Sequence, residues 1–407
     1  MTGTPLDPKP ALRRRLGLLL LVLYGTGITI GAGIYVLIGA VAGHAGAYSV
    51  WSFILAAAVM ALTVGSYAEM ATRYPVSAGE AAYVRAAFNS RFLSTTVGLL
   101  TVCINVVAAS AVALGSAGYI RQFIDLPAPA IILAVVLSLG AVAAWGILES
   151  VALAGLFTLV EAGGLIWIIG SAFHMGLPPP SSFAVPPMDA ATLSGISFAS
   201  LLAFFAFVGF EGLANIVEEA KAPHRDIPWA MTMTLLLTTV LYVLIAAISV
   251  AAVPPGELAA SPAPLSLVFR TVTGMNPATF NLIAVVATLN TVLAQMTMAS
   301  RIIYGMARQG DLPTGLSSVH ARTGTPLIAT AAVILAVTGL ALAFPIEELA
   351  EGTSLATLAA FAFVNLSLLR IRMKRIHSAA PHVRVPIWVP TMGILTCVAM
   401  FAVALLL

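Results

Sequence analysis

Closely spaced glycines and isolated glutamates are the residues of this sequence that could do chemistry inside a membrane. Four glycines fall within the nine residues from Gly25 to Gly33, at the middle of an apolar run from Leu16 to Ala42. Each weakens an α-helix by roughly 1 kcal/mol relative to alanine. An interrupted helix at membrane depth must be buried in protein or line a polar cavity, where its free amides and carbonyls suit a small zwitterion. The alternative is close packing of helices through small residues.

A second apolar run, Ser194 to Glu219, carries a carboxylate between glycines in the order Gly209, Phe210, Glu211, Gly212. An ionised side chain at mid-span costs at least about 2.5 to 3.5 kcal/mol, so it marks a functional position. We interpret this run as a second interrupted helix. Paired interruptions at corresponding places in two inverted halves indicate a secondary-transporter binding site near the membrane midplane.

The composition identifies a polytopic membrane protein. Of the 407 residues, 60% are hydrophobic and only 9% are charged, and the mean hydropathy is +1.02. These values exclude a soluble globular domain. Apolar windows predict an all-α fold with about eleven transmembrane helices, near residues 16–43, 48–72, 92–120, 129–147, 151–174, 194–219, 229–252, 278–306, 326–344, 352–372 and 386–406.

The charge distribution predicts the orientation. Of the 19 Lys and Arg residues, 17 fall on one side of these spans, and only Arg121 and Arg270 fall on the other. By the positive-inside rule we expect a multi-pass protein of the cytoplasmic (inner) membrane with a cytoplasmic N-terminus. The pI of about 9.0 is explained by loops that face anionic lipid and gives no argument for nucleic acid. The short amphipathic segment from Pro75 to Asn89 is typical of an interfacial helix.

Neither the cysteines nor the histidines form a pattern typical of a disulfide or a metal site. Cys103 and Cys397 lie inside apolar runs, and the six histidines are scattered near span ends. No pairing of serine with histidine is found that would supply a nucleophile and a base at membrane depth. We therefore expect no metal, no cofactor and no enzymatic activity.

Three motifs resemble those of the amino acid/polyamine/organocation superfamily of transporters, of the bacterial amino acid permease type. Gly-Ile-Thr-Ile-Gly-Ala-Gly-Ile-Tyr, from Gly27 to Tyr35, resembles the family's glycine-rich first helix. The stretch from Phe204 to Pro228 resembles its sixth helix and the following loop. Ala299 to Pro313 resembles the end of its eighth helix.

This resemblance implies one transporter domain over residues 1–407. Its core would be a five-plus-five inverted repeat with discontinuous helices 1 and 6. Repeat one would cover about 16–174, repeat two about 194–372, and one extra helix about 386–406. The family usually has a twelfth helix, for which we find no span, and the oligomeric state stays open.

The resemblance and the physics agree on how an amino acid's carboxylate would bind. The N-terminus of a half-helix offers N–H donors and a positive field without any side-chain charge. We expect the carboxylate at the amides that open the outer half of the first helix, those of Gly31, Ala32 and Gly33.

The ammonium group of the substrate needs acceptors instead. We expect backbone carbonyls to supply them, at Ile28 in the first helix and at Phe205, Ala206 and Val208 in the sixth. The resemblance also implies that Phe205 is a gate that covers the substrate from outside. We interpret Phe207 as a packing residue of the core.

Energy coupling is assigned to the intramembrane acids. The resemblance implies that Glu161 stands in the fifth span where several relatives carry a lysine and where sodium-driven relatives of the same fold bind an ion. A buried carboxyl group can take up and release a proton. Our hypothesis is proton-coupled uptake with Glu161 as the carrier; the alternatives are a neutral Glu161 bonded to the broken first helix and a sodium ion bound by Glu161. For Glu211 we expect a latch that holds the second break to neighbouring helices, with proton handling as its second role.

Charged residues at the cytoplasmic end could form a gate of ion pairs, namely Arg73, Glu218, Glu219 and Arg225. A solvated set of charges is the alternative. We expect spans three, six, eight and ten to line the side-chain pocket and the substrates to be neutral or small apolar amino acids. Rival interpretations are a polyamine or organic-amine carrier, an amino acid exchanger and, more distantly, a channel, which would need a continuous polar pore.

Overall fold

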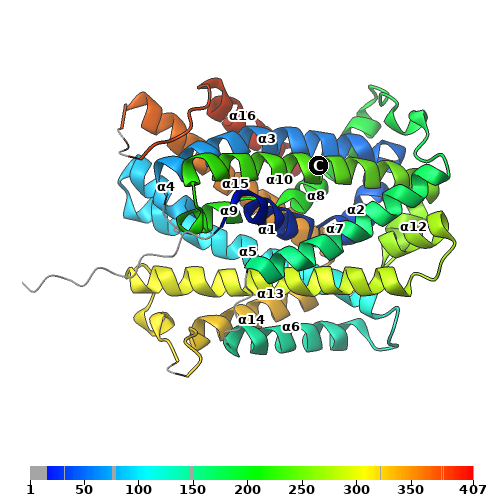
Figure 1. Cartoon of the computed structure of the whole chain (residues 1–407), viewed down its shortest axis with the longest axis horizontal. Coiled ribbons are helices and arrows are strands. Elements are labelled where there is room, and N and C mark those ends of the chain that lie inside the picture. Colours follow the sequence, from blue (N-terminus) through cyan, green and yellow to red (C-terminus); the bar gives the residue numbers. More distant parts are fainter. Residues whose placement is uncertain are drawn as a thin grey trace, which may run out of the picture.

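The computed structural model describes residues 16–31, 33–75, 79–145, 151–320, 322–376, 378 and 380–406, and within them the fold is helical (Figure 1). No strand occurs in this part of the chain, whose isolated parallel bridge joins Leu16 to Ala220. Nine of the described helical stretches are long and apolar enough to cross a membrane, and two shorter apolar helices accompany them, Leu18–Ile30 and Leu327–Ala343. Each of the eleven expected spans has a helical counterpart, because the stretch Gly33–Arg73 covers the second half of the first span and the whole of the second.

The first and sixth spans are interrupted, as expected. The first consists of α1 (Leu18–Ile30) and α2 (Gly33–Ala45). The sixth consists of α8 (Ala190–Phe207) and the short α9 (Gly212–Asn215). The other spans are continuous: α3 (Ser49–Arg73), α5 (Arg91–Ile120), α6 (Ala128–Trp145), α7 (Val151–His174), α10 (Pro223–Ala252), α13 (Ala278–Arg308), α14 (Leu327–Ala343), α15 (Ile346–Met373) and α16 (Trp388–Leu406).

The two interrupted helices lie at the centre of the molecule. α1 packs against α7 and α10, and α2 packs against α8 (Figure 1). Around them, the long helices α5 and α13 pack on each other, α3 packs on α10, and α6 pairs with α14 at the periphery. The eleventh helix, α16, covers α3 and α15.

Short helices close the two ends of the bundle. The interfacial helix expected near Pro75 is α4 (Gly79–Phe88), which packs on α5 and α15. At the other end, the proline-rich connection after α10 contains α11 (Pro255–Ala260) and α12 (Pro264–Thr273), which sequence analysis did not find. They form because proline is compatible with the first turn of a helix, where its missing N–H would have no partner.

One end of the bundle, which we call the basic side, is the end at which α1 and α5 begin and α3, α13 and α15 finish. There Glu69 of α3 is fully buried between two arginines. Its Oε1 accepts from Arg73 Nε at 2.8 Å and from Arg372 Nε at 3.0 Å, and Arg372 Nη2 also bonds to Oε2. Val385 N donates to Oε2 at 2.9 Å. This cluster ties α3, α15 and the segment that leads to α16 together.

Replacing Glu69 by glutamine is expected to destabilise the fold strongly, because two arginines would remain without their anion. Removing one partner of a buried charge cluster costs on the order of 3 kcal/mol. The measurement is thermal unfolding in detergent. The matched control is Glu348→Gln, at an exposed position in the first turn of α15. An equal unfolding temperature for the two variants would contradict this role of Glu69.

Candidate substrate site

Four helix ends meet at the centre of the molecule. The C-termini of α1 and α8 and the N-termini of α2 and α9 converge there. Gly209, with φ of +136°, packs against the first break: a Cβ atom there would lie 2.6 Å from Ile28 O. A Cβ atom on Gly33 would lie 2.3 Å from the Ala206 Cα atom. The two breaks therefore contact each other through glycine backbone. These glycines both interrupt their helices and allow the two breaks to pack closely.

Tyr242 of α10 joins the two breaks and was missed by sequence analysis. Its fully buried hydroxyl oxygen lies 2.8 Å from Thr29 O and 2.9 Å from Ala206 O. One hydroxyl group thus lies within hydrogen-bond distance of a C-terminal carbonyl of each half-helix. The last carbonyls of a helix have no partner within that helix. A tyrosine inside an apolar span carries no sequence signal that separates this role from packing.

The structure revises the predicted carboxylate donors. The N–H of Gly31 donates to Gly27 O at 3.0 Å, so the expectation that this amide is free was wrong: it closes the last turn of α1. Ala32 lies outside the described residues. Gly33 opens α2, where the first N–H groups of a helix have no carbonyl to bind. The remaining donors are therefore Gly33 and its successors in the first turn.

The predicted ammonium acceptors gather at the same point. Val208 N donates to Phe205 O at 3.1 Å, and Ala206 O faces Tyr242. A hollow of about 270 Å³, counting space open to solvent, is lined by Ile28, Thr29, Gly33, Ala108, Val112, Phe205, Val208, Thr291 and Gln295, and we call it the break cavity. Spans one, three, six and eight thus meet at this cavity. The predicted core residue Phe207 is fully buried, and its ring lies 4.9 Å from that of Tyr242, which confirms it as a packing residue.

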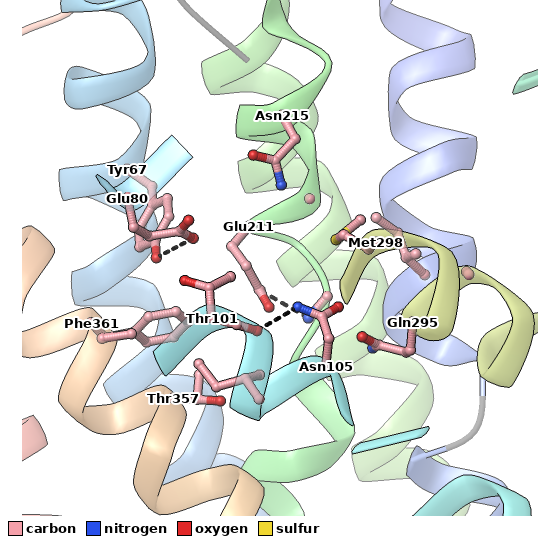
Figure 2. A pocket seen from close by; sticks show the side chains of 16 residues that line it. Tyr67, Glu80, Thr101, Asn105, Glu211, Asn215, Gln295, Met298, Thr357 and Phe361 are labelled. Atoms are coloured by element: carbon pink, nitrogen blue, oxygen red, sulfur yellow. Dashed lines mark hydrogen bonds between the residues drawn. The ribbon is translucent and has the colours of Figure 1, made fainter. Parts of the chain in front are cut away.

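A second hollow, which we call the acidic chamber, adjoins the break cavity on its basic side and shares Ile28 and Gln295 with it. It measures about 510 Å³, counting space open to solvent. Its polar lining comes from α3, α4, α5, α9, α13 and α15 and from the second break, and Figure 2 shows these side chains: Tyr67, Glu80, Thr101, Asn105, Glu211, Asn215, Gln295 and Thr357. Span ten was also expected to line the pocket, and it lines the acidic chamber and not the break cavity.

Two acids face the acidic chamber. Glu211 Oε2 accepts from Gly209 N at 2.8 Å, so Glu211 braces the break locally; no hydrogen bond of its side chain to a neighbouring helix is found among the described residues. Glu80, from the non-spanning helix α4, is 5% exposed and accepts from the Tyr67 hydroxyl at 2.9 Å. Burial raises the pKa of the Glu80 carboxyl, and the hydrogen bond from Tyr67 offsets part of that effect. Sequence analysis did not single out Glu80, because α4 lies outside every span.

Glu161 lies on the opposite flank, on α7, and is fully buried. Its Oε1 lies 3.4 Å from Asn290 Nδ2 of α13. The hydroxyl of Tyr35 of α2 donates to the Glu161 carbonyl at 2.6 Å, and one turn earlier Thr158 donates to Leu23 O of α1 at 3.0 Å. Glu161 therefore stands where both halves of the broken first helix meet α7 and α13, and it lines neither cavity.

The predicted gate residues form a different arrangement from the one expected. Arg73 pairs with Glu69 and Arg225 pairs with Asp226 at 3.0 Å, and neither arginine pairs with Glu218 or Glu219 among the described residues, so the expected gate stays a prediction. Glu219 contributes its backbone: Leu16 N donates to Glu219 O at 3.0 Å. Lys221 N donates to Leu16 O at 2.8 Å. Backbone pairing thus ties the start of α1 to the segment after α9.

Gly33→Ala is expected to lower the stability of the protein, although alanine ordinarily stabilises a helix. The added methyl group would overlap Ala206, and such overpacking costs about 1 to 3 kcal/mol. The control is Gly339→Ala in α14, where a Cβ atom meets nothing within 4 Å and the helix should gain up to about 1 kcal/mol. Thermal unfolding of both variants checks the sign, and a more stable Gly33→Ala protein would contradict the close contact of the breaks.

Comparison with known proteins agrees with this geometry. A family model described as amino acid permease matches residues 16–407. The branched-chain amino acid permease BcaP of Bacillus subtilis is 29% identical over 392 residues, covering 90% of this chain and 82% of its own. An uncharacterised transporter of Mycobacterium tuberculosis is 34% identical, with coverage of 90% and 83%. The vacuolar cationic amino acid transporter 4 of Arabidopsis thaliana is 30% identical, with coverage of 90% and 64%.

Among solved structures, a manganese transporter mutant of Eremococcus coleocola shares the fold. Its TM-score is 0.65 at 15% identity, over 95% of this chain and 86% of that one. A likeness at this identity supports the architecture alone. With a family model that covers nearly all of its length, this chain belongs to the amino acid permease family of the amino acid/polyamine/organocation superfamily, and it is a multi-pass membrane transporter.

Proposed function

We propose that this protein is a secondary active transporter that imports neutral or small apolar amino acids across the cytoplasmic membrane by alternating access. The observation that carries the proposal is the break cavity. One opening helix end, that of α2, and two closing helix ends, those of α1 and α8, meet at it. Helix N-termini attract anions and C-termini attract cations, so this arrangement matches the two charges of an amino acid.

In this proposal the substrate carboxylate binds at Gly33 and the following amides of α2. The ammonium group binds near the carbonyls of Ile28, Phe205 and Val208. Both charges are met by backbone dipoles, which require no buried side-chain charge and so avoid the desolvation that such a charge would suffer. Figure 1 shows why the site is central: α1, α2 and α8 are surrounded by the other spans.

The lining of the break cavity supports an apolar substrate side chain. Ala108 and Val112 of α5 face it together with Phe205, and no charged residue lines it in the described part of the chain. Phe205 is 5% exposed at the end of the outer half-helix α8, a position consistent with a gate that covers the substrate. The similarity to a branched-chain amino acid permease points the same way.

The proposed cycle uses two inverted repeats, residues 16–174 and 194–372, with the N-terminus in the cytoplasm. The basic side, where Leu16 pairs with the segment at Ala220, is then the cytoplasmic end. We assign the coupling ion to Glu161 and take it to be a proton, because that carboxyl group contacts α13 and its own backbone contacts α2. Both halves of the first helix and α13 border this position, so its charge could bias their packing.

The first test is a thermal-shift screen of the detergent-purified protein against the twenty amino acids and their decarboxylated amines. A ligand at one hundred times its Kd stabilises the native state by about 2.7 kcal/mol. We expect leucine, isoleucine or valine to raise the unfolding temperature and the corresponding amines to have no effect, because the amines lack the group that binds at α2. Equal stabilisation by the amines would favour an organic-amine carrier and contradict carboxylate capture.

Coupling is tested with Glu161→Gln in proteoliposomes. If Glu161 carries the proton, the wild-type protein accumulates substrate when the outside is acidic, and the variant loses this accumulation but keeps exchange of substrate across the membrane. Uptake is followed from about pH 5 to pH 8, with and without sodium. Exposed Glu348→Gln is the control. Proton-driven accumulation that persists in Glu161→Gln would exclude Glu161 as carrier.

A further inference from the structure

The acidic chamber has a lining that the transport of small apolar amino acids does not use. Glu80 and Glu211 place two carboxyl groups on one hollow, and none of its lining residues in the described chain is Lys, Arg or His. Like charges in a shared space of low polarity repel each other and are poorly solvated. A bound cation would relieve both effects.

The amide of Asn105 supports a cationic ligand independently of the acids. Asn105 is 5% exposed, and its Nδ2 donates to Thr101 O of the preceding turn at 2.7 Å. This bond fixes the amide so that its oxygen faces the chamber, beside Gln295, and no hydrogen bond to that oxygen is found among the described residues (Figure 2). A carbonyl oxygen that faces the chamber without a donor favours a ligand that brings N–H groups.

The hydroxyl groups that line the chamber also favour a cationic ligand. Thr101 and Thr357 each donate to a carbonyl of their own helix, at 3.0 and 2.8 Å. Their protons are used, so their oxygens are left as acceptors toward the chamber. Tyr67 and Phe361 add aromatic rings to the lining, with centroids 5.3 Å apart, and aromatic faces attract ammonium and guanidinium groups. The chamber is therefore rich in acceptors and in groups that stabilise positive charge.

Its position relates the chamber to the substrate. It shares Ile28 and Gln295 with the break cavity, and apolar Met298 lies beside Gln295 in its lining. A long side chain that starts at the breaks could thus run past Ile28 with its methylene groups and place its charged end in the chamber. Lysine, ornithine and arginine have this build, an apolar stem with a cationic head.

We propose that Glu80, Glu211 and Asn105 form a subsite for the cationic end of a basic amino acid, so that the transporter accepts basic as well as apolar amino acids. The proposal rests on the proposed function, because the carboxylate and α-ammonium groups bind at the breaks as before. It adds a specificity determinant on α4, a helix that crosses no membrane, and it assigns to Glu211 a second contact beyond Gly209.

The test compares lysine with norleucine, which has the same chain length but no terminal charge. Dissociation constants of both are measured by thermal shift or isothermal titration, for the wild type and for Glu80→Gln. Glutamine can still accept the hydrogen bond from Tyr67 while losing the charge. We expect Glu80→Gln to lower the ratio of lysine affinity to norleucine affinity at least about tenfold, the loss typical of a charged hydrogen-bond partner. Glu257→Gln, at an exposed position on α11, should keep the wild-type ratio.

Two further measurements keep the proposal falsifiable if Glu80→Gln does not fold. Asn105→Leu removes the amide acceptor without touching either carboxyl group, and should also lower the ratio. Cadaverine, which is lysine without its carboxylate, should bind at least about tenfold more weakly than lysine to the wild-type protein.

The outcomes separate the two proposals. Norleucine binding without lysine binding, or an unchanged affinity ratio in both Glu80→Gln and Asn105→Leu, would overturn the cationic subsite and leave the proposed function intact. Failure of every amino acid to bind would overturn the proposed function and the subsite with it. Cadaverine binding as tightly as lysine would show that the breaks do not hold a carboxylate, which contradicts both.

Discussion

The structure depends on one constraint: at membrane depth every backbone N–H and C=O group must find its partner inside the protein. The two interrupted helices meet this constraint in part through a neighbouring helix, because the Tyr242 hydroxyl of α10 bonds to both breaks. Gly209 packs on Ile28 O, Gly33 packs on Ala206, and one hydroxyl group, that of Tyr242, reaches carbonyls of both breaks. The break cavity lies where residues of both breaks come together. The proposed binding site is thus built from backbone at the two breaks.

The buried acids lie on two different sides of the breaks, depending on which helices carry them. Glu161 stands on the flank made by α7, α2 and α13, and it lines neither cavity. Glu80 and Glu211 stand on the basic side of the breaks and face one chamber. A charge on the first flank would bias the packing of the broken first helix, whereas charges on the second would act on what enters the pathway. The two proposals therefore assign coupling and selectivity to different flanks of the breaks.

Two kinds of contact join the helices at the basic side, and they differ in strength and in the segments that they connect. Glu69 with its arginines binds α3 to α15 and to the segment before α16, through a buried cluster that is costly to open. The start of α1 is held to the segment after α9 by backbone hydrogen bonds at Leu16. Single hydrogen bonds of this kind contribute about 1 kcal/mol each. On the basic side, the start of α1 is consequently held by weaker polar contacts than those that join α3 to α15.

The sequence by itself determined the membrane class, the places of the spans and both interruptions, because apolar length and glycine or carboxylate content at mid-span are local properties of the chain. It also found Ile28, Gly33, Phe205 and Val208, which line the break cavity. Only the tertiary structure showed that Gly31 N is occupied, that Tyr242 joins the breaks and that Glu80 reaches a chamber beside them. Each of these depends on which atoms lie opposite one another across different helices. That information is set by packing between segments far apart in the chain, and no local pattern of residues carries it.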